Sequence, residues 1–279
     1  MNENLTSQLK RTALKVREHC IRMSGNGGAF IGSALSCTDL LVYLYAQFLK
    51  IKNGDMDRDY FFLSKGHAVP ALYGTLAEIG LLEKERLVSH LSPSDDIYWH
   101  PNKKIKGVEF HSGSLGHLLS VAAGVALDCK LRGTGNRVAV LLGDGELNEG
   151  SNWEACLLAG AYKLDNLIVI IDRNRFQANK KTEELIPLEP LEAKFAAFGL
   201  AAETVDGHDF DQLDELFFQI PLEHDKPNVV IAETVRGKGL PSIESRADRW
   251  FCNLTGKDVE LLVQELYVSG AMQTAADAL

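Results

Sequence analysis

Four short, continuous runs of apolar residues, separated by segments of helical pattern, constrain the fold of this chain more than any other feature. The runs cover 60–63, 138–142, 167–171 and 229–232, and such runs are typical of strands buried on both faces. Helices are expected between them at about 115–131, 148–162 and 210–218. The expected fold class is therefore α/β, a doubly wound, mainly parallel sheet with helices on both faces.

Two further helices are expected before the first strand. Apolar residues share one face of the first, which covers 5–23. Thr38 and Asp39 are suitable caps for the second, which continues to Phe48. The longest irregular connection is expected at 92–107, which contains two prolines, two aspartates and three lysines. Long connections of this kind are often lids or binding loops.

Length, charge and cysteine content narrow the class of protein. A chain of 279 residues can bury a large core, and we expect one domain over 1–279. The net charge of −9 argues against a nucleic acid or an anionic membrane as partner. The five cysteines are scattered, which argues against a disulfide framework or a zinc cluster. With a polar N-terminus and no membrane-spanning run, the cytoplasm is the expected compartment.

Polar residues follow two neighbouring strands of the expected sheet. The loop 143–150 reads Gly-Asp-Gly-Glu-Leu-Asn-Glu-Gly and contains Asp144, and Asn174 follows the next strand. The carboxyl ends of parallel strands meet at one edge of a sheet, so both side chains are expected there. Carboxylate and amide oxygens suit Mg²⁺, and glycine lets a diphosphate approach the backbone. Gly-Asp-Gly alone is typical of a tight turn, whereas its pairing with Asn174 favours a shared site.

Other short motifs stand before and after this pair. The motifs are Phe-Leu-Ser-Lys-Gly-His-Ala at 62–68, Trp-His-Pro at 99–101, Gly-Ser-Leu-Gly at 113–116, Asp-Arg-Asn-Arg-Phe at 172–176 and Thr-Val-Arg-Gly-Lys-Gly at 234–239. In these motifs and their order, the chain resembles the N-terminal half of transketolase, from about Ser24 onward. The resemblance implies the thiamine-diphosphate-binding fold, with thiamine diphosphate and Mg²⁺ (or Ca²⁺ or Mn²⁺) as cofactors.

The resemblance also implies ligands for the metal and the diphosphate. Asp144 and Asn174 are expected to bind Mg²⁺ through side-chain oxygens, and Phe176 through its backbone carbonyl. Gly145 and Glu146, in the same loop as Asp144, are expected at the cofactor, as is Asn174 itself.

Two basic residues complete the implied diphosphate site. His67 is expected to contact the diphosphate and to belong to the catalytic group. Lys238 either reaches the diphosphate or is a solvated lysine, and the residues leave both readings open.

The turn formed by Gly113, Ser114 and Leu115 is implied to hold the cofactor's aminopyrimidine through backbone groups. Glu149 and Glu154 follow the metal loop, where the family places acidic residues at a subunit interface. They are expected either to connect active sites or to be exposed helix carboxylates.

Departures from the family's pattern concern the partner and the substrate. The chain ends at Leu279, so we expect the pyrimidine-binding domain on a separate chain, with two copies of each in the complex. In the implied substrate shell, His100 is expected to hold a donor hydroxyl. Asn26 and Phe251 stand where we expect histidines that would hydrogen-bond a sugar.

Three functions remain compatible with these residues. The first is transfer of a two-carbon ketol unit from a ketose or its phosphate to an aldehyde by a split transketolase. The second keeps the cofactor but takes a 2-oxo acid as donor, with decarboxylation and acyl transfer. The third is a non-catalytic subunit that binds the cofactor or a partner for regulation.

Overall fold

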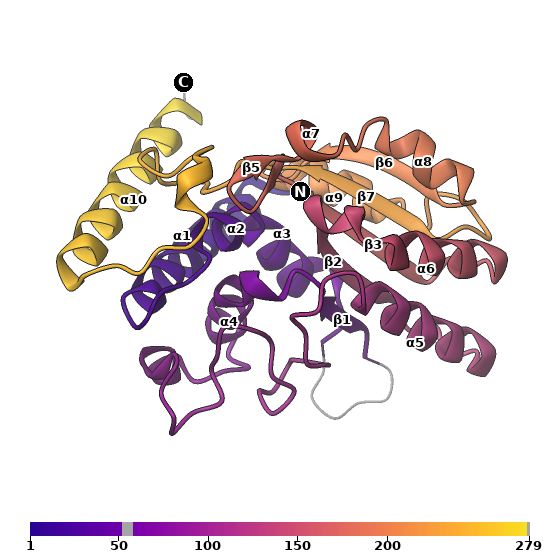
Figure 1. Cartoon of the computed structure of the whole chain (residues 1–279), viewed down its shortest axis with the longest axis horizontal. Helices are drawn as coiled ribbons and strands as arrows, with labels where there is room; N and C mark the ends of the chain where they lie inside the picture. The colour runs from indigo at the N-terminus through magenta and orange to yellow at the C-terminus, as the bar shows by residue number, and fades with distance from the viewer. Residues whose placement is uncertain (52–57, 278–279) are drawn as a thin grey trace.

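Five parallel strands form the central sheet of the protein, in the order β1-β2-β3-β7-β6 (Figure 1). The structure is a computed structural model that describes residues 1–51 and 58–277. The strands are β1 (Tyr60–Leu63), β2 (Val138–Gly143), β3 (Leu167–Arg173), β6 (Ala201–Asp206) and β7 (Asn228–Glu233), and a separate antiparallel hairpin pairs β4 (Phe176–Gln177) with β5 (Lys180–Lys181). All four apolar runs are strands of this sheet, so the predicted fold class is confirmed.

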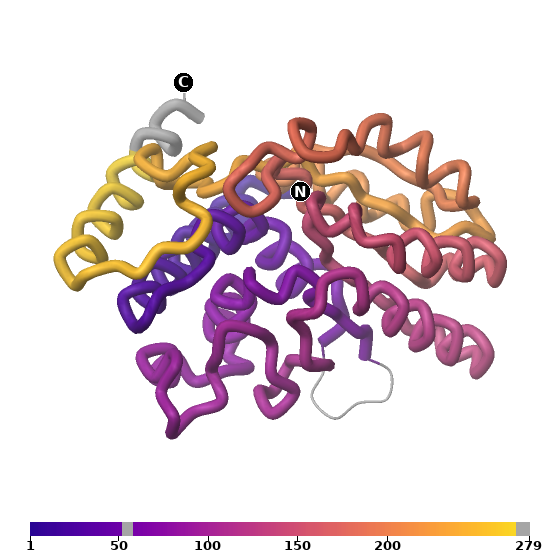
Figure 2. The backbone as a smooth tube through the Cα atoms, in the orientation of Figure 1, coloured from indigo at the N-terminus to yellow at the C-terminus, as the bar shows by residue number. Residues whose placement is uncertain are grey.

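Helices cover both faces of the sheet (Figures 1 and 2). The α-helices are α1 (Glu3–Ser24), α2 (Ile31–Ser36), α3 (Thr38–Tyr43), α4 (Val69–Glu78), α5 (Leu118–Arg132), α6 (Gly150–Ala161), α7 (Thr182–Leu185), α8 (Leu191–Ala197), α9 (Phe210–Phe218) and α10 (Gly256–Asp277). Shorter helical segments are η1 (Leu44–Phe48), η2 (Gly66–Ala68), η3 (Lys84–Ser89), η4 (Gly145–Asn148) and η5 (Ala247–Arg249). Within the described residues, no helix is both long and apolar enough to cross a membrane.

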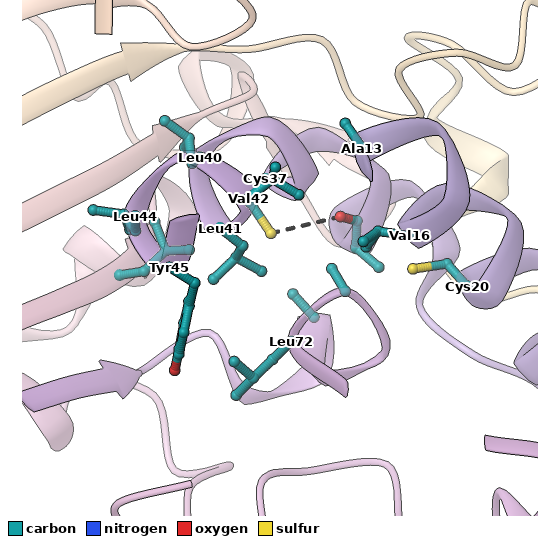
Figure 3. Close-up of a cluster of buried hydrophobic side chains, with 14 of the residues drawn as sticks. Ala13, Val16, Cys20, Cys37, Leu40, Leu41, Val42, Leu44, Tyr45 and Leu72 are labelled. Atoms are coloured by element: carbon teal, nitrogen blue, oxygen red, sulfur yellow. Dashed lines mark hydrogen bonds between the residues drawn. The ribbon is translucent and has the colours of Figure 1, made fainter. Parts of the chain in front are cut away.

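Successive residues of each central strand face opposite sides of the sheet, and this divides the core in two. Leu141 and Ile170 pack with α1 to α4 in the larger part, a section of which is drawn in Figure 3. Val140 and Val169 pack on the other face against α5, α6 and α8. Strands β2 and β3 are therefore buried on both faces, as their unbroken apolar sequences predict.

A buried ion pair joins α1 to α3. The Arg17 guanidinium donates to both oxygens of Asp39, at 2.9 and 2.6 Å, and Nδ1 of His208 lies 2.7 Å from Asp39 Oδ2. Burial opposes the charge of Asp39, but Arg17 and His208 outweigh it and hold the pKa of this carboxyl well below its usual range.

One local prediction is wrong, and one strand was not predicted. Thr38 and Asp39 do not cap the second helix: Thr38 is its first residue and donates its hydroxyl to the Ala34 carbonyl, while Asp39 is used by Arg17. Strand β6 was not predicted, because it lies at the sheet edge and its middle residues Glu203 and Thr204 are exposed. The irregular segment 92–107 is confirmed, and Ile97 and Ile105 fasten it to the core.

Replacing Leu141 by alanine tests the two-sided burial of β2. Leu141 is fully buried, so Leu141→Ala is expected to lower the free energy of unfolding by about 2–5 kcal/mol. The matched change Leu131→Ala, at a side chain that is 78% exposed, is expected to shift it by no more than about 0.5 kcal/mol. Urea unfolding followed by circular dichroism measures both, and equal midpoints would contradict the assignment of β2 to the core.

Candidate functional site

A cavity of about 230 Å³ lies at the carboxyl ends of β2 and β3. The register places Gly143 beside Asp172 and Asp172 beside Ala232, so the loops after three neighbouring strands meet there. The lining residues are Ser33, Lys65, His67, Leu115, Gly143, Asp144, Gly145, Glu146, Glu149, Asn174, Phe176, Gln177, Ala178, Arg236 and Trp250. This edge of a parallel sheet is the usual place for a ligand.

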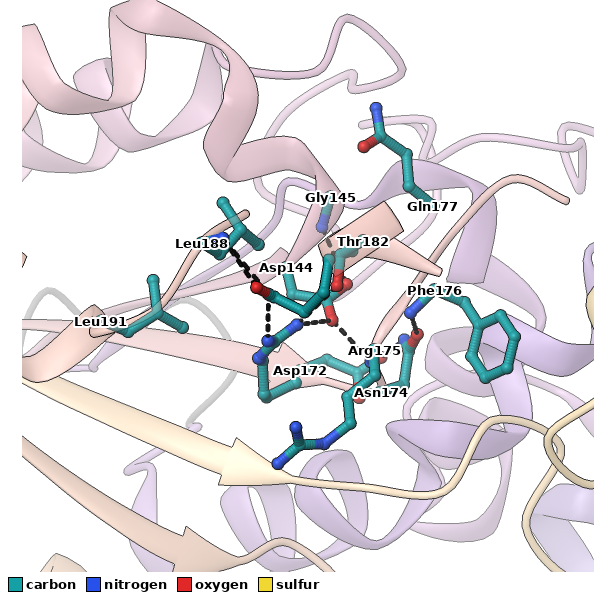
Figure 4. A network of polar contacts seen from close by, with 12 residues as sticks. Asp144, Gly145, Asp172, Asn174, Arg175, Phe176, Gln177, Thr182, Leu188 and Leu191 are labelled. Carbon is teal, nitrogen blue, oxygen red and sulfur yellow. Dashed lines mark hydrogen bonds and ion pairs between the residues drawn. The ribbon is translucent and has the colours of Figure 1, made fainter. Parts of the chain in front are cut away.

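Asp144 begins the loop after β2, and its carboxylate is held by three donors (Figure 4). Oδ1 accepts from the N–H of Gly145 at 2.8 Å. Oδ2 accepts from the N–H of Arg175 at 2.6 Å and from the Arg173 guanidinium at 2.9 Å. Burial and the neighbouring Asp172 raise the pKa of Asp144 to about 6, although Arg173 partly offsets them. A divalent cation would favour the ionised form of this carboxyl.

Asn174 lies beside Asp144 with its amide group oriented by two contacts. Its Nδ2 donates to Oδ2 of Asp172 at 2.9 Å, and its Oδ1 accepts from the N–H of Phe176 at 3.1 Å. Because the nitrogen faces a carboxylate, Oδ1 is the atom of this amide that can bind a cation. Asp144 and Asn174 therefore offer two hard oxygen ligands, which fits a magnesium ion.

Glu146 connects the loop after β2 to the turn at 113–116. Its buried carboxylate accepts from the N–H groups of Gly116 at 2.9 Å and Gly143 at 3.2 Å, and from the hydroxyl of Ser64. Burial raises the pKa of Glu146, which these hydrogen bonds partly offset. Gly116 has a φ of 82°, and a Cβ there would lie 2.6 Å from the Cβ of Glu149. The turn is thus packed directly against the loop.

Gly145 is a position where only a bare backbone fits. A Cβ there would lie 2.8 Å from the Cβ of Gln177, at the hairpin β4–β5. The hairpin is fixed to the loop after β2 because Nδ2 of Asn148 donates to Oε1 of Gln177 at 3.0 Å. The backbone at Gly145 therefore lies against the hairpin, closer than a side chain at this position would allow.

Two histidines, His67 and His100, lie near the cavity, and His67 is one of its lining residues. His67 is partly buried, with Nε2 3.0 Å from the hydroxyl of Ser33. Burial, with Lys65 and His100 nearby, lowers the pKa of His67 to about 3, so the ring is neutral at physiological pH. His100 packs on the turn, since a Cβ at Gly113 would lie 2.9 Å from its Cδ2, and burial lowers the pKa of His100.

Arg236 is a site residue that the sequence reasoning did not single out. Its side chain is 2% exposed, lines the cavity and lies over the ring of Phe176, with 5.1 Å from Cζ to the ring centroid. Nη1 donates to the Ala178 carbonyl at 2.6 Å. Nε and Nη2 have no hydrogen-bond partner among the described residues. Unpartnered buried guanidinium nitrogens beside two metal-type ligands fit an anion such as a diphosphate.

The turn after β7 decides which basic side chain faces the cavity. Gly237 has a φ of 78°, and its N–H donates to the Gly32 carbonyl at 2.9 Å. This turn brings Arg236 inward. Lys238 instead lines a separate hollow with Arg175 and other residues, and its carbonyl accepts from Arg17. The signal in the sequence that favours Arg236 is its place directly before Gly237, the glycine that turns the chain.

The remaining predicted residues fall into two groups. Leu115 and Glu149 line the cavity, and the exposed Gly113 and Ser114 belong to the turn that carries Leu115. Glu154 is exposed on α6, outside the cavity lining.

Neither Asn26 nor Phe251 is among the lining residues. Asn26 is exposed, and its amide donates to the carbonyl of Val88 at 3.0 Å. Phe251 is 40% exposed and follows Trp250, which does line the cavity.

Fold and site together define a class: an α/β protein with a cavity suited to a divalent cation and a phosphorylated anion. Residues 19–273 match the family model described as transketolase, thiamine diphosphate binding domain. The chain belongs to this family, as its motifs predicted. It is a thiamine-diphosphate-binding domain of the transketolase kind.

Two relatives are themselves named as subunits. The chain is 37% identical to an apulose-4-phosphate transketolase subunit from Actinobacillus succinogenes over 265 residues, which cover 93% of this chain and 96% of the relative. It is 35% identical to the 6-deoxy-6-sulfo-D-fructose transketolase subunit of a Clostridium species, with 88% and 90% covered. These relatives are of similar length to this chain.

Solved transketolases share the fold but are longer. The structure matches transketolase from Campylobacter jejuni with a TM-score of 0.84 and 28% identity, over 95% of this chain and 43% of that one. It matches the Leishmania mexicana enzyme with a TM-score of 0.81 and 23% identity, over 97% and 46%. The chain thus spans less than half the length of these solved chains.

Methionine substitutions at Arg236 and Lys238 test which side chain serves the cavity. Arg236→Met is expected to weaken binding of thiamine diphosphate with Mg²⁺ by about 10- to 150-fold, since it removes a charged hydrogen-bond donor worth about 1.5–3 kcal/mol. Lys238→Met, the matched control, is expected to change the dissociation constant by less than about threefold. Calorimetric titration measures both, with thermal unfolding as a check on folding. A larger loss for Lys238→Met would contradict the assignment.

Proposed function

We propose that this chain is the diphosphate- and metal-binding subunit of a split thiamine-diphosphate transketolase, which moves a two-carbon ketol unit to an aldehyde. One observation carries the proposal: Asp144, Asn174 and Arg236 line one cavity, and two buried nitrogens of Arg236 have no hydrogen-bond partner among the described residues. The family match and the relatives named as transketolase subunits support it.

The loops after β2 and β3 would hold the metal. Asp144 and Asn174 would bind Mg²⁺ through side-chain oxygens, with the Phe176 carbonyl as third protein ligand, and phosphate oxygens and water would complete an octahedron. Ca²⁺ or Mn²⁺ would occupy the same ligands. The support is that the Asn174 amide donates its nitrogen to Asp172, which leaves its oxygen as the atom that can bind a metal.

The diphosphate would lie between the backbone of Gly145 and the side chains of His67 and Arg236. Glu146 would act on the cofactor indirectly, by holding the turn that carries Leu115. Thiamine diphosphate, when bound, supplies a nucleophilic carbon that stores the electron pair of a broken carbon–carbon bond. The chain's own task is to bind and orient that group, with the backbone of 113–115 toward its pyrimidine ring.

A separate pyrimidine-binding chain would complete the active site. The support is that the relatives are named as subunits, and that the solved transketolases are more than twice the length of this chain. We propose two copies of each chain, with Glu149 and Glu154 at the interface between them. All five cysteines are free thiols and buried, which supports a reducing compartment such as the cytoplasm.

Sugars are the first substrates to consider. The two relatives are named for apulose-4-phosphate and for 6-deoxy-6-sulfo-D-fructose. By analogy a ketose or ketose phosphate is a candidate donor for this chain, with His100 beside the turn to hold a donor hydroxyl. A 2-oxo acid is the second candidate donor.

The change Asp144→Asn tests the function without regard to the donor. The variant keeps the shape of the side chain but loses one negative charge, so activity of the complex is expected to fall at least about 100-fold at limiting Mg²⁺. The control Asp128→Asn, at a surface ion pair with Arg132, is expected to keep full activity.

The assay measures carbon–carbon bond formation from a panel of ketose phosphates and 2-oxo acids with an aldehyde. Full activity of Asp144→Asn would contradict the metal assignment. A native complex that binds the cofactor but turns over no donor would favour the non-catalytic alternative.

A further inference from the structure

Arg236 lies in a turn after β7, and we call residues 234–239 the Arg236 turn. The N–H of Val235, directly before Arg236, donates to Nε2 of His208 at 2.8 Å. His208 is outside the lining of the cavity, and its side chain is 10% exposed. A largely buried imidazole therefore holds the backbone next to a residue that does line the cavity.

The end of β6 brings His208 to the Arg236 turn. Strands β6 and β7 are parallel neighbours, so both end at the same edge of the sheet. The N–H of Gly207 donates to the Glu233 carbonyl at 2.8 Å, and a Cβ at Gly207 would lie 2.6 Å from Cγ2 of Thr234. Only glycine allows this close approach, and the next residue, His208, consequently lies against Val235.

Arg17 and Asp39 hold the same turn at a point after Arg236. Nε of Arg17 donates to the Lys238 carbonyl at 3.0 Å, while its Nη1 and Nη2 donate to the carboxylate of Asp39. That carboxylate also lies 2.7 Å from Nδ1 of His208. One buried carboxylate thus connects both contacts with the Arg236 turn, and we call Arg17, Asp39 and His208 the anchor group.

The contacts of His208 select one tautomer of its ring. A backbone N–H can only donate, so Nε2, which accepts from Val235, carries no proton. Nδ1 is then the protonated nitrogen and donates to Asp39, whose carboxylate only accepts. Asp39 therefore fixes the tautomer in which the lone pair of Nε2 faces the Arg236 turn.

The position of the Arg236 side chain depends on the backbone of its turn. Nη1 donates to the Ala178 carbonyl, and Nε and Nη2 have no hydrogen-bond partner among the described residues. Packing against α2 is tight, since a Cβ at Gly32 would lie 2.9 Å from Nε of Arg236. A long side chain with few contacts loses rotamer freedom when it binds an anion, and a backbone that is already fixed lessens this cost. Contacts that fix the turn therefore bear on how well Arg236 binds an anion.

We propose that the anchor group positions Arg236 for the cofactor, by holding the turn where the guanidinium meets the diphosphate. Its three members are positioning residues that act through the backbone of Val235 and Lys238, and none of them touches the cofactor. This inference rests on the proposed function, because it takes the diphosphate of thiamine diphosphate as the anion at Arg236.

A double-mutant cycle between His208 and Arg236 tests the proposal. Calorimetry measures the dissociation constant of thiamine diphosphate in the complex of this chain with its partner, with Mg²⁺ present. In His208→Asn the shorter side chain keeps an N–H for Asp39 but does not reach Val235, and we expect binding to be about three- to tenfold weaker. In the Arg236→Met background, the same change is expected to weaken binding by less than about twofold, since no guanidinium is left to position.

The variant His208→Gln tests the contact with Val235 by rescue. Its amide oxygen can accept from the Val235 N–H, so we expect a dissociation constant within about twofold of the wild type. A loss as large as that of His208→Asn would contradict the role of this contact. His224→Asn, at a side chain that is 89% exposed, is the matched control and is expected to leave the dissociation constant unchanged in both backgrounds.

Thermal unfolding of the same variants separates positioning from stability. An equal loss of affinity in both backgrounds, or a lower unfolding midpoint with no loss of affinity, would make His208 a structural residue and overturn this inference alone. A wild-type complex that binds no thiamine diphosphate overturns the proposed function as well. His208→Ala takes the place of His208→Asn in the cycle if the asparagine variant does not fold.

Discussion

The buried pair of Lys65 and Asp172 is the interaction on which the geometry of the site depends. Both side chains are fully buried, and Lys65 also donates to the Ser33 carbonyl at 3.0 Å. Asp172 accepts from the hydroxyls of Ser36, at 2.6 Å, and Thr234. One carboxylate at the end of β3 therefore connects the residues after β1, the helix α2 and the residues after β7. Removing one member of such a pair typically costs about 3–5 kcal/mol, because the other charge is left buried alone.

Asp172 also accepts a hydrogen bond from the amide nitrogen of Asn174. The same carboxylate therefore supports the fold and orients a candidate metal ligand. The lining of the cavity is of two chemical kinds. Asp144, Asn174 and Arg236 are polar or charged groups suited to a metal and a diphosphate, whereas Leu115, Phe176 and Trp250 are apolar. A cofactor that binds by its phosphates and reacts at its far ring can use both.

Sequence reasoning predicts those site residues whose chemical type and whose place after a strand both indicate a ligand. Asp144 and Asn174 follow unbroken apolar strands, so their meeting follows from parallel pairing alone. Sequence reasoning fails where contacts between distant segments decide which side chain takes a given place. Arg236 rather than Lys238 faces the cavity because Gly237 turns the chain, and Asp39 is taken by Arg17 instead of capping a helix. Strand β6 lacks the apolar run because it lies at the edge of the sheet.

The most direct test of the central claim, that the loops after β2 and β3 form one metal and diphosphate site, is a crystal structure of the complex. Mn²⁺ in place of Mg²⁺ would allow the metal to be located by anomalous scattering. The structure predicts a single peak bonded to Asp144 and Asn174, with the diphosphate against Gly145 and Arg236. A metal bound elsewhere, or a cofactor whose phosphates lie outside this cavity, would contradict it.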